Sequence, residues 1–420
     1  MSERTASQQT VRGGVAIAGA MGIMNVTTYA FTILAARLLG PAEYGSLAAV
    51  MGVLLVVNVL SLGLQATGAR RVSANPGDLR EIRRQVMATS YVAALVLGGL
   101  VLAISPVLTS LLDLDSWISA VLIGVTAVPL TIMGAQAGIL QGQRRWGPLA
   151  AIYLTVGLGR ISFGAVALIV DPDTLGAMIG VASGAFIPVV IGWLALRSDH
   201  SRPPAAESPR AATHRWARGG VLHETMHNSH ALLAFFALSN VDVLVARITL
   251  DAHQAGLYAG GLILAKAVLF LPQFVVVVAF PAMARTGAGR RMHLISLGLV
   301  LAMGTVTVLG VLVLSWLAVV FVGGPEYAEI QDLLWAFAVL GTLLATIQLL
   351  IYNIVARQRQ RTVLLVWAAL AALLCASPFI GSMTELLVVV VAVDATLFLG
   401  LFARSLTASY QQSPTVPPIA

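Results

Sequence analysis

The chain has 420 residues, of which 58% are hydrophobic and only 10% are charged. Soluble proteins carry roughly 25% charged residues, so this composition excludes an ordinary soluble protein and indicates a membrane protein with many spans. The formal net charge is +7, but the basic residues are spread along the chain, unlike the clustered pattern of a nucleic-acid-binding protein. The single cysteine, Cys375, excludes an internal disulfide and a cysteine-based metal site.

Apolar segments long enough to cross a bilayer recur along the whole sequence. A helical span needs about 20 apolar residues, because the hydrocarbon layer is about 30 Å thick and a helix rises about 1.5 Å per residue. The first apolar segment is too long for the core of a signal peptide, so we expect it to be retained. We predict an all-α fold with twelve transmembrane helices, near residues 13–36, 45–69, 86–111, 117–141, 147–170, 175–196, 222–246, 256–283, 292–322, 328–355, 362–380 and 385–404.

The distribution of basic residues predicts the orientation of these helices. If the N-terminus is cytoplasmic, the segments on the cytoplasmic side hold 21 of the 25 Lys and Arg residues. The opposite side holds only Arg37 and Arg247, both at helix ends, together with many of the acidic residues. This is the positive-inside pattern, and an even number of spans returns the C-terminus to the cytoplasm.

The sequence also contains signs of an internal duplication. Ala-Arg-Leu at 36–38 recurs as Ala-Arg-Ile at 246–248, and Gln-Arg at 143–144 recurs at 358–359, so the offsets are 210 and 215 residues. Because each half holds six spans, both halves would have the same orientation and be related by an axis along the membrane normal. The predicted domains are an N-terminal six-helix lobe (1–196), a cytoplasmic linker (197–220), a C-terminal six-helix lobe (221–404) and a cytoplasmic tail (405–420).

Four short motifs resemble those of one transporter family. They are LAARLLGPAEYG at 34–45, GILQGQRR at 138–145, NVDVL at 240–244 and AGLYA at 255–259. They are similar to motifs of polysaccharide and O-antigen flippases, which belong to the multidrug/oligosaccharidyl-lipid/polysaccharide transporter superfamily. The resemblance implies two six-helix lobes around a central cavity that opens alternately to each side of a bacterial inner membrane. It also implies transport of an undecaprenyl-diphosphate-linked oligosaccharide to the outer leaflet, coupled to H⁺ or Na⁺.

Such a cargo explains why a protein is needed. A diphosphate and a hydrated glycan cannot cross hydrocarbon unaided, because each buried charge and hydroxyl loses its water. The expected partners are therefore the lipid-linked oligosaccharide, H⁺ or Na⁺, the phospholipid bilayer and other membrane proteins of glycan assembly. We expect no nucleic acid, no cofactor and no enzymatic activity.

Ionisable side chains inside spans are the first candidates for the site, because they usually face a protein interior or an aqueous cavity. We predict that Arg160 and Lys266 contact the diphosphate, since the helix of Arg160 holds no acid and a guanidinium matches a diphosphate through paired donors. We predict that Asp242 or Asp394 exchanges the coupling ion. The remaining candidates for substrate binding are Arg37, Arg247, Asn58, Gln65, Gln136 and Gln348.

Each of these residues also has a structural interpretation. Arg37 and Arg247 can extend to the membrane interface or pair with Glu43 and Asp251 in the next turn. Asp242 can pair with Lys266 between neighbouring helices. The amides can simply join helices within the bilayer.

Two patterns suggest other functions. His223-Glu224-Thr225-Met226-His227 is the HExxH pattern of zinc proteases, in which two histidines bind the metal and the glutamate acts as a base. An intramembrane protease also needs a third ligand from another helix, and the sequence offers no segment of the usual type. The Asp-x-Asp pairs at 113–115 and 171–173 mimic sugar transferases, but they lie on the predicted outer face, where nucleotide sugars are absent. The further alternatives are a multidrug exporter of the same superfamily and a non-transporting scaffold for glycan assembly.

Overall fold

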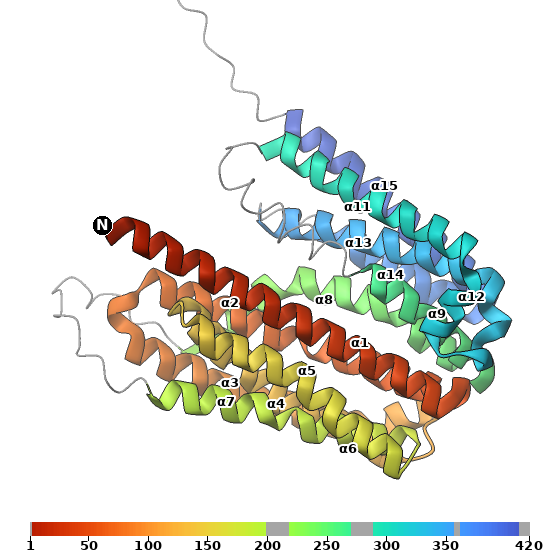
Figure 1. Ribbon diagram of the computed structural model, residues 1–420, viewed down its shortest axis with the longest axis horizontal. Helices are drawn as coiled ribbons and strands as arrows, with labels where there is room; N and C mark the ends of the chain where they lie inside the picture. The colour runs from red at the N-terminus through yellow and green to blue at the C-terminus, as the bar shows by residue number, and fades with distance from the viewer. Residues whose placement is uncertain (1, 199–217, 270–288, 357–361, 411–420) are drawn as a thin grey trace, which may run out of the picture. The chain divides into compact units, whose positions relative to one another are not determined.

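The computed structural model describes residues 2–198, 218–269, 289–356 and 362–410, and these residues form helices without any β-strand (Figure 1). This confirms the predicted all-α fold. Short 3-10 helices stand at η1 (Pro76–Asp78), η3 (Pro325–Leu333) and η5 (Ser377–Phe379). The α-helices are α1 (Ser2–Val57), α2 (Val59–Ala74), α3 (Leu79–Leu111), α4 (Trp117–Gly142), α5 (Trp146–Val170), α6 (Thr174–Gly184), α7 (Phe186–Arg197), α8 (Arg218–Thr249), α9 (Ala252–Val268), α11 (Gly289–Val313), α12 (Ser315–Val322), α13 (Leu334–Ala356), α14 (Val363–Ala376) and α15 (Met383–Tyr410).

The helices have the length and composition of membrane spans. Nine helical stretches of the described residues are long and apolar enough to cross a bilayer, and Val363–Phe379 is a shorter apolar helix. The first stretch, Gly13–Ala74, contains two of the predicted spans, and α9 is the described part of another. The chain is therefore a multi-pass membrane protein. Parts of three predicted segments lie outside the described residues, namely 199–217 of the linker, 270–283 of the eighth span and 411–420 of the tail.

The first two predicted spans are joined inside α1 by a turn at Gly40. Its φ of 69° lies in the left-handed region that favours glycine, and Pro41 starts the next helical segment. Glu43, in the first turn of that segment, accepts hydrogen bonds from the backbone N–H (3.0 Å) and the hydroxyl (2.7 Å) of Thr174 at the start of α6. The motif at 34–45 therefore forms a turn whose acid holds the N-terminus of another helix.

A row of glycines brings α4 close to α2. A Cβ atom added at Gly134 would lie 2.3 Å from the carbonyl oxygen of Ser61, and one at Gly138 would lie 2.4 Å from that of Gln65. Gly142 continues the row one turn further along α4. Glycines at intervals of four residues allow membrane helices to approach until their backbones touch.

The predicted span at 175–196 is divided into α6 and α7. Pro188 has no N–H to bond the carbonyl of Gly184, so one helical hydrogen bond is missing beside Ala185, whose φ of −67° and ψ of −18° stay helical. At this position Gly184 packs directly on Gly159 of α5: a Cβ added at Gly159 would lie 2.9 Å from the carbonyl oxygen of Gly184.

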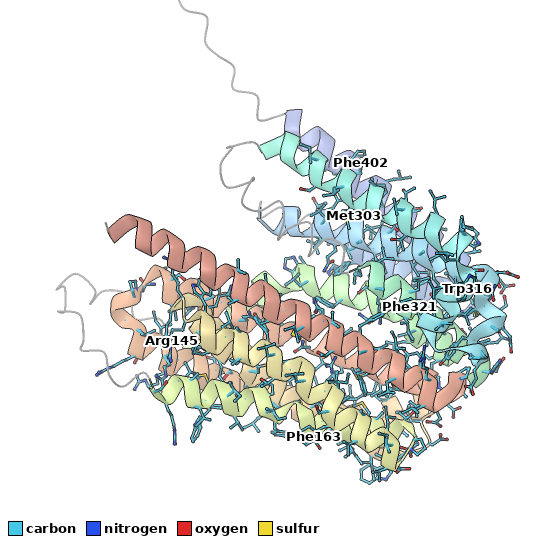
Figure 2. The ribbon with its side chains drawn as sticks, in the orientation of Figure 1. Arg145, Phe163, Met303, Trp316, Phe321 and Phe402 are labelled. Carbon is cyan, nitrogen blue, oxygen red and sulfur yellow. The ribbon has the colours of Figure 1, made fainter. Side chains whose placement is uncertain are left out.

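The chain separates into two compact units, Met1–Phe236 and Ala237–Ala420, with the boundary inside α8. In the first unit α1 packs on α5, and α4 packs on α2 and α3 (Figure 1). In the second unit α13 contacts α9, α11 and α15. Large apolar side chains such as Phe163 of α5 and Trp316 and Phe321 of α12 are exposed, as expected for helices that face lipid (Figure 2).

One contact occurs at equivalent places in the two units. Glu43 holds Thr174 at the start of α6, and in the second unit Gln254 Oε1 accepts a hydrogen bond from the N–H of Met383 (3.4 Å) at the start of α15. Glu43 and Gln254 are 211 positions apart, and Thr174 and Met383 are 209 apart, close to the offset of the sequence repeat. The lobe boundaries at 196 and 221 stay a prediction.

Candidate functional site

Buried acidic side chains gather in the second unit, on α8 and α15. Asp242 of α8 is only 1% exposed. Its Oδ2 accepts a hydrogen bond from the hydroxyl of Tyr258 on α9 (3.2 Å), and its Oδ1 accepts one from the N–H of Val243 (2.9 Å). Asp394 of α15 is 2% exposed and interacts electrostatically with both Asp242 and Tyr258. The two carboxyl groups predicted to exchange the coupling ion therefore lie in one cluster.

Lys266 of α9 adds a positive charge to this cluster. Its Nζ donates a hydrogen bond to Asn240 Oδ1 (3.0 Å), and Asn240 Nδ2 donates to Ser239 Oγ (3.2 Å). Lys266 also interacts electrostatically with Asp242. Tyr258 and Asn240 thus position the charged groups, and both stand in the motifs at 240–244 and 255–259.

The cluster of Asp242, Tyr258, Lys266 and Asp394, which we call the buried charge cluster, has a definite chemical capacity. Burying charge in a membrane interior is costly unless opposite charges compensate it. Two ionised carboxyl groups beside one ammonium carry one uncompensated negative charge. The cluster is therefore suited to bind and release a proton or a small cation, which would neutralise that charge. Among the described residues, no group of three or more His, Cys, Asp or Glu side chains is arranged to hold a metal ion.

Arg160 belongs to the first unit, on α5, where it lines a small cavity. The cavity offers about 10 Å³ to a water-sized sphere, which suits one water molecule and is far too small for a diphosphate. In the described part of the chain, no acid or hydrogen-bond acceptor contacts the guanidinium. The other residues around the cavity are Thr126, Leu130, Val156, Val181, Gly184, Ala185 and Pro188.

The amides of the first unit mainly join helices. Gln65 Nε2 of α2 donates hydrogen bonds to the hydroxyl of Tyr153 on α5 (2.6 Å) and to Oε1 of Gln141 on α4 (3.0 Å). Gln136 is buried and donates to a backbone carbonyl of α7 (3.2 Å). Asn58 stands at the break between α1 and α2, and its Oδ1 is buried without a partner among the described residues. Tyr153 and Gln141 are not among the residues predicted for the site, although a tyrosine and an amide near span ends are a possible signal.

The three remaining candidates occupy different settings. Arg37 is exposed at the end of the first segment of α1. Arg247 is 9% exposed in the last turn of α8, and Gln348 of α13 is 6% exposed, both in the second unit.

Acidic residues of the predicted outer turns hold helix N-termini. Asp173 Oδ1 accepts a hydrogen bond from the N–H of Gly176 (2.6 Å), and Asp251 Oδ1 accepts one from the N–H of Gln254 (2.9 Å). Glu43 acts in the same way on α6. One Asp-x-Asp pair therefore includes an ordinary helix cap.

The glutamate of the HExxH pattern is bound by two arginines of α2. Glu224 Oε2 accepts hydrogen bonds from Nε (3.0 Å) and Nη2 (2.9 Å) of Arg71, and Oε1 accepts one from Arg70. The side chains of His223 and His227 lie outside the described residues. The carboxylate that a protease would use as a base is thus held in ion pairs.

Solved structures share the fold over almost the whole chain. A structure described as the inward-facing conformation of a multidrug resistance MATE family transporter of the MOP superfamily matches 96% of this chain and 99% of its own, with 14% identity and a TM-score of 0.66. The eukaryotic MATE transporter AtDTX14 matches 95% of this chain and 96% of its own, with 13% identity and a TM-score of 0.58. A MOP superfamily transporter from Pyrococcus furiosus Vc1 matches 97% of this chain and 96% of its own, with 14% identity and a TM-score of 0.58. The chain therefore has the fold of these transporters.

Sequence comparison identifies the family. None of the curated protein sequences compared with the chain matches it. The family model described as polysaccharide biosynthesis protein matches residues 10–287, which is well over half of the chain, and this confirms the resemblance inferred from the motifs. The chain belongs to the polysaccharide biosynthesis protein family and has the fold of MOP superfamily transporters.

Proposed function

We propose that this protein moves an oligosaccharide linked to undecaprenyl diphosphate from the cytoplasmic to the outer leaflet of a bacterial inner membrane. The observation that carries the proposal is a transporter fold in a chain whose family is described by polysaccharide biosynthesis. The products of that synthesis are needed outside, whereas lipid-linked sugars are assembled on the cytoplasmic side. Both termini then lie in the cytoplasm, as the positive-inside pattern predicts.

The proposed mechanism is alternating access by two six-helix lobes, 1–196 and 221–404, joined by the linker 197–220. The polar head group travels through a wet, cationic passage while the lipid tail stays in the bilayer, which avoids the cost of stripping water from the diphosphate. Phospholipid and other membrane proteins of glycan assembly are the remaining partners in this proposal.

Coupling to an ion gradient is assigned to the buried charge cluster. Among the described residues, no group donates a hydrogen bond to the Asp394 carboxyl group, and this carboxyl group lies within electrostatic reach of Asp242. Binding of H⁺ or Na⁺ there changes the charge balance against Lys266. A change of net charge inside the bilayer alters the stability of whichever arrangement of helices buries it, and this links ion binding to movement.

Contact with the diphosphate is assigned to Arg160 and Lys266. Arg160 is the stronger candidate, because no acid among the described residues neutralises its guanidinium and it offers paired donors to phosphate oxygens. Since its cavity holds only about one water molecule, the proposal requires the cavity to widen when cargo binds. The missing hydrogen bond beside Ala185, between α6 and α7, weakens the helix in the wall of the cavity, and this is where we expect the wall to move.

The test is reconstitution of the purified protein in vesicles that contain a fluorescent polyprenyl-diphosphate sugar. An impermeant reagent outside the vesicles measures how fast the sugar reaches the outer leaflet. We expect Arg160→Ala and Lys266→Ala to slow this transfer, while Arg84→Ala, which removes a residue of an exposed surface pair, retains the parent rate. Parent rates in both of the first two variants would refute the assignment of cargo contacts, and an inactive parent protein would refute the flippase proposal.

Export of small amphipathic drugs is a second candidate, because the matching structures include a multidrug resistance transporter. The charges within spans do not choose between the two, since Arg160 and Lys266 balance Asp242 and Asp394. The same vesicles loaded with a cationic dye separate the candidates. Dye transport without transfer of the glycolipid would favour the drug exporter.

A further inference from the structure

The first half of α8 contacts the end of α2 within the first unit. We call this line of contacts the seam. Glu224 accepts hydrogen bonds from Arg70 and Arg71, as described above. The side chains of Arg71 and Glu224 are only 7% and 16% exposed, whereas Arg70 is 60% exposed. A doubly paired carboxylate that is mostly withdrawn from water is held more firmly than an ordinary surface ion pair.

Two more contacts continue this seam along both helices. The hydroxyl of Thr225 donates to that of Thr67 (3.2 Å), and both side chains are fully buried. One turn further, Ser229 fits against Gly63, where an added Cβ would lie 1.8 Å from the serine Oγ. Gly63, Thr67 and Arg71 follow at intervals of four, so they share one face of α2.

The chemistry of the seam favours reversible opening. Its groups are a carboxylate, two guanidinium groups, three hydroxyl groups and one glycine, so separation in contact with water exposes mainly polar surface. Each hydrogen bond lost between the helices is replaced by one to water, and the net cost per bond is modest. The seam also lies where α2 ends and α8 begins, at the predicted cytoplasmic side, and α8 runs unbroken across the boundary between the two units.

We propose that Glu224 and Thr225 of α8, closed on Thr67, Arg70 and Arg71 of α2, form a latch that shuts the cytoplasmic side in one state of the transport cycle and releases in the other. This α2–α8 latch rests on the proposed alternating access, but it does not depend on which cargo is carried. It gives Glu224 of the HExxH pattern a conformational role in place of a catalytic one.

The first test measures opening directly. In a Cys375→Ser background, Thr67→Cys places a thiol at a position with 0% exposure, where an impermeant maleimide reacts slowly while the latch is closed. Glu224→Gln removes the ion pairs and keeps the side-chain shape, so we expect labelling to rise about tenfold, equivalent to about 1.4 kcal/mol. Glu81→Gln, which removes an exposed pair with Arg84, is the matched control and should leave the rate unchanged. Equal labelling in the Glu224→Gln variant and its parent would overturn the latch.

The second test closes the latch covalently. The two threonine hydroxyls are 3.2 Å apart, so Thr67→Cys with Thr225→Cys should form a disulfide. We expect oxidation to stop transfer of the lipid-linked sugar and reduction to restore it, while the single Thr67→Cys variant is unaffected by oxidation. Unchanged transfer in the oxidised double variant would also overturn the latch. If the reduced protein transfers no sugar, the proposed function fails, and the labelling result still decides the latch.

Discussion

The glycine row of α4 leads to a quantitative prediction for Gly138→Ala. The new Cβ would lie 2.4 Å from the carbonyl oxygen and 2.8 Å from the Cα of Gln65, both backbone atoms that cannot rotate away. Ordinary contact begins at 3.4 Å, so α2 and α4 must separate by about 1 Å at this point. We therefore expect the substitution to weaken the packing between α2 and α4 along the whole glycine row.

The size of the effect follows from the contacts that the separation weakens. The three glycines of the row are Gly134, Gly138 and Gly142. If each makes roughly ten carbon–carbon contacts of about 0.15 kcal/mol with α2, the row contributes roughly 4.5 kcal/mol of dispersion energy. A gap of 0.5–1 Å forfeits about a quarter to a half of it, so the loss is about 1–2 kcal/mol. This agrees with the cost of about 1–3 kcal/mol that overpacked cores commonly show.

The control is Gly99→Ala on α3, where nothing lies within 4 Å of the added Cβ. Both variants gain the same helix propensity from alanine, about 1 kcal/mol, so the difference between them isolates the clash. In thermal unfolding of the purified protein, we expect Gly138→Ala to unfold roughly 2–8 °C below Gly99→Ala. Equal unfolding temperatures would refute the claim that backbone contact at Gly138 stabilises the first unit.

Three further substitutions test other parts of the structure. Glu43→Ala removes the acid that holds the start of α6 and should cost about 0.5–2 kcal/mol of stability in thermal unfolding, whereas exposed Asp115→Ala should cost little. Tyr153→Phe removes the acceptor of a hydrogen bond from Gln65 and should cost about 1 kcal/mol in the same assay, with exposed Tyr91→Phe as the neutral control. Asp394→Asn should leave sugar transfer in vesicles insensitive to an imposed H⁺ or Na⁺ gradient, while exposed Asp332→Asn retains the response. A retained gradient response in Asp394→Asn would remove Asp394 from the coupling mechanism.

The fold was predictable because the bilayer imposes a simple rule on the sequence. Apolar length determines where spans occur, and it needs no knowledge of distant contacts. The interruptions were harder to predict. The division between α6 and α7 at Ala185 reflects the missing N–H of Pro188, yet Pro106 of α3 and Pro129 of α4 lie inside helices without such a division. Whether a proline breaks a helix in the membrane depends on neighbours that can satisfy the freed carbonyl, and these come from other helices.

The candidate site was predictable in part for a similar reason. Asp242, Lys266 and Asp394 stand out because ionisable groups are rare inside spans, and the structure brings them into one cluster. Their roles stay a prediction. The sequence suggests that Lys266 can pair with Asp242, but that its Nζ donates a hydrogen bond to Asn240 depends on how α8 and α9 pack.

The HExxH pattern shows why partners decide what a motif does. Within its five residues, Glu224 has the spacing of a metalloprotease base, and nothing nearby in the sequence contradicts that function. Its actual partners, Arg70 and Arg71, are more than 150 residues away and were counted only as part of a cytoplasmic positive charge. Both oxygens of the Glu224 carboxylate are already held by guanidinium groups, so the side chain fits the proposed α2–α8 latch better than the role of a protease base. The distribution of basic residues predicts only that Arg70 and Arg71 lie on a cytoplasmic segment. That they bind Glu224 follows from the packing of α8 on α2.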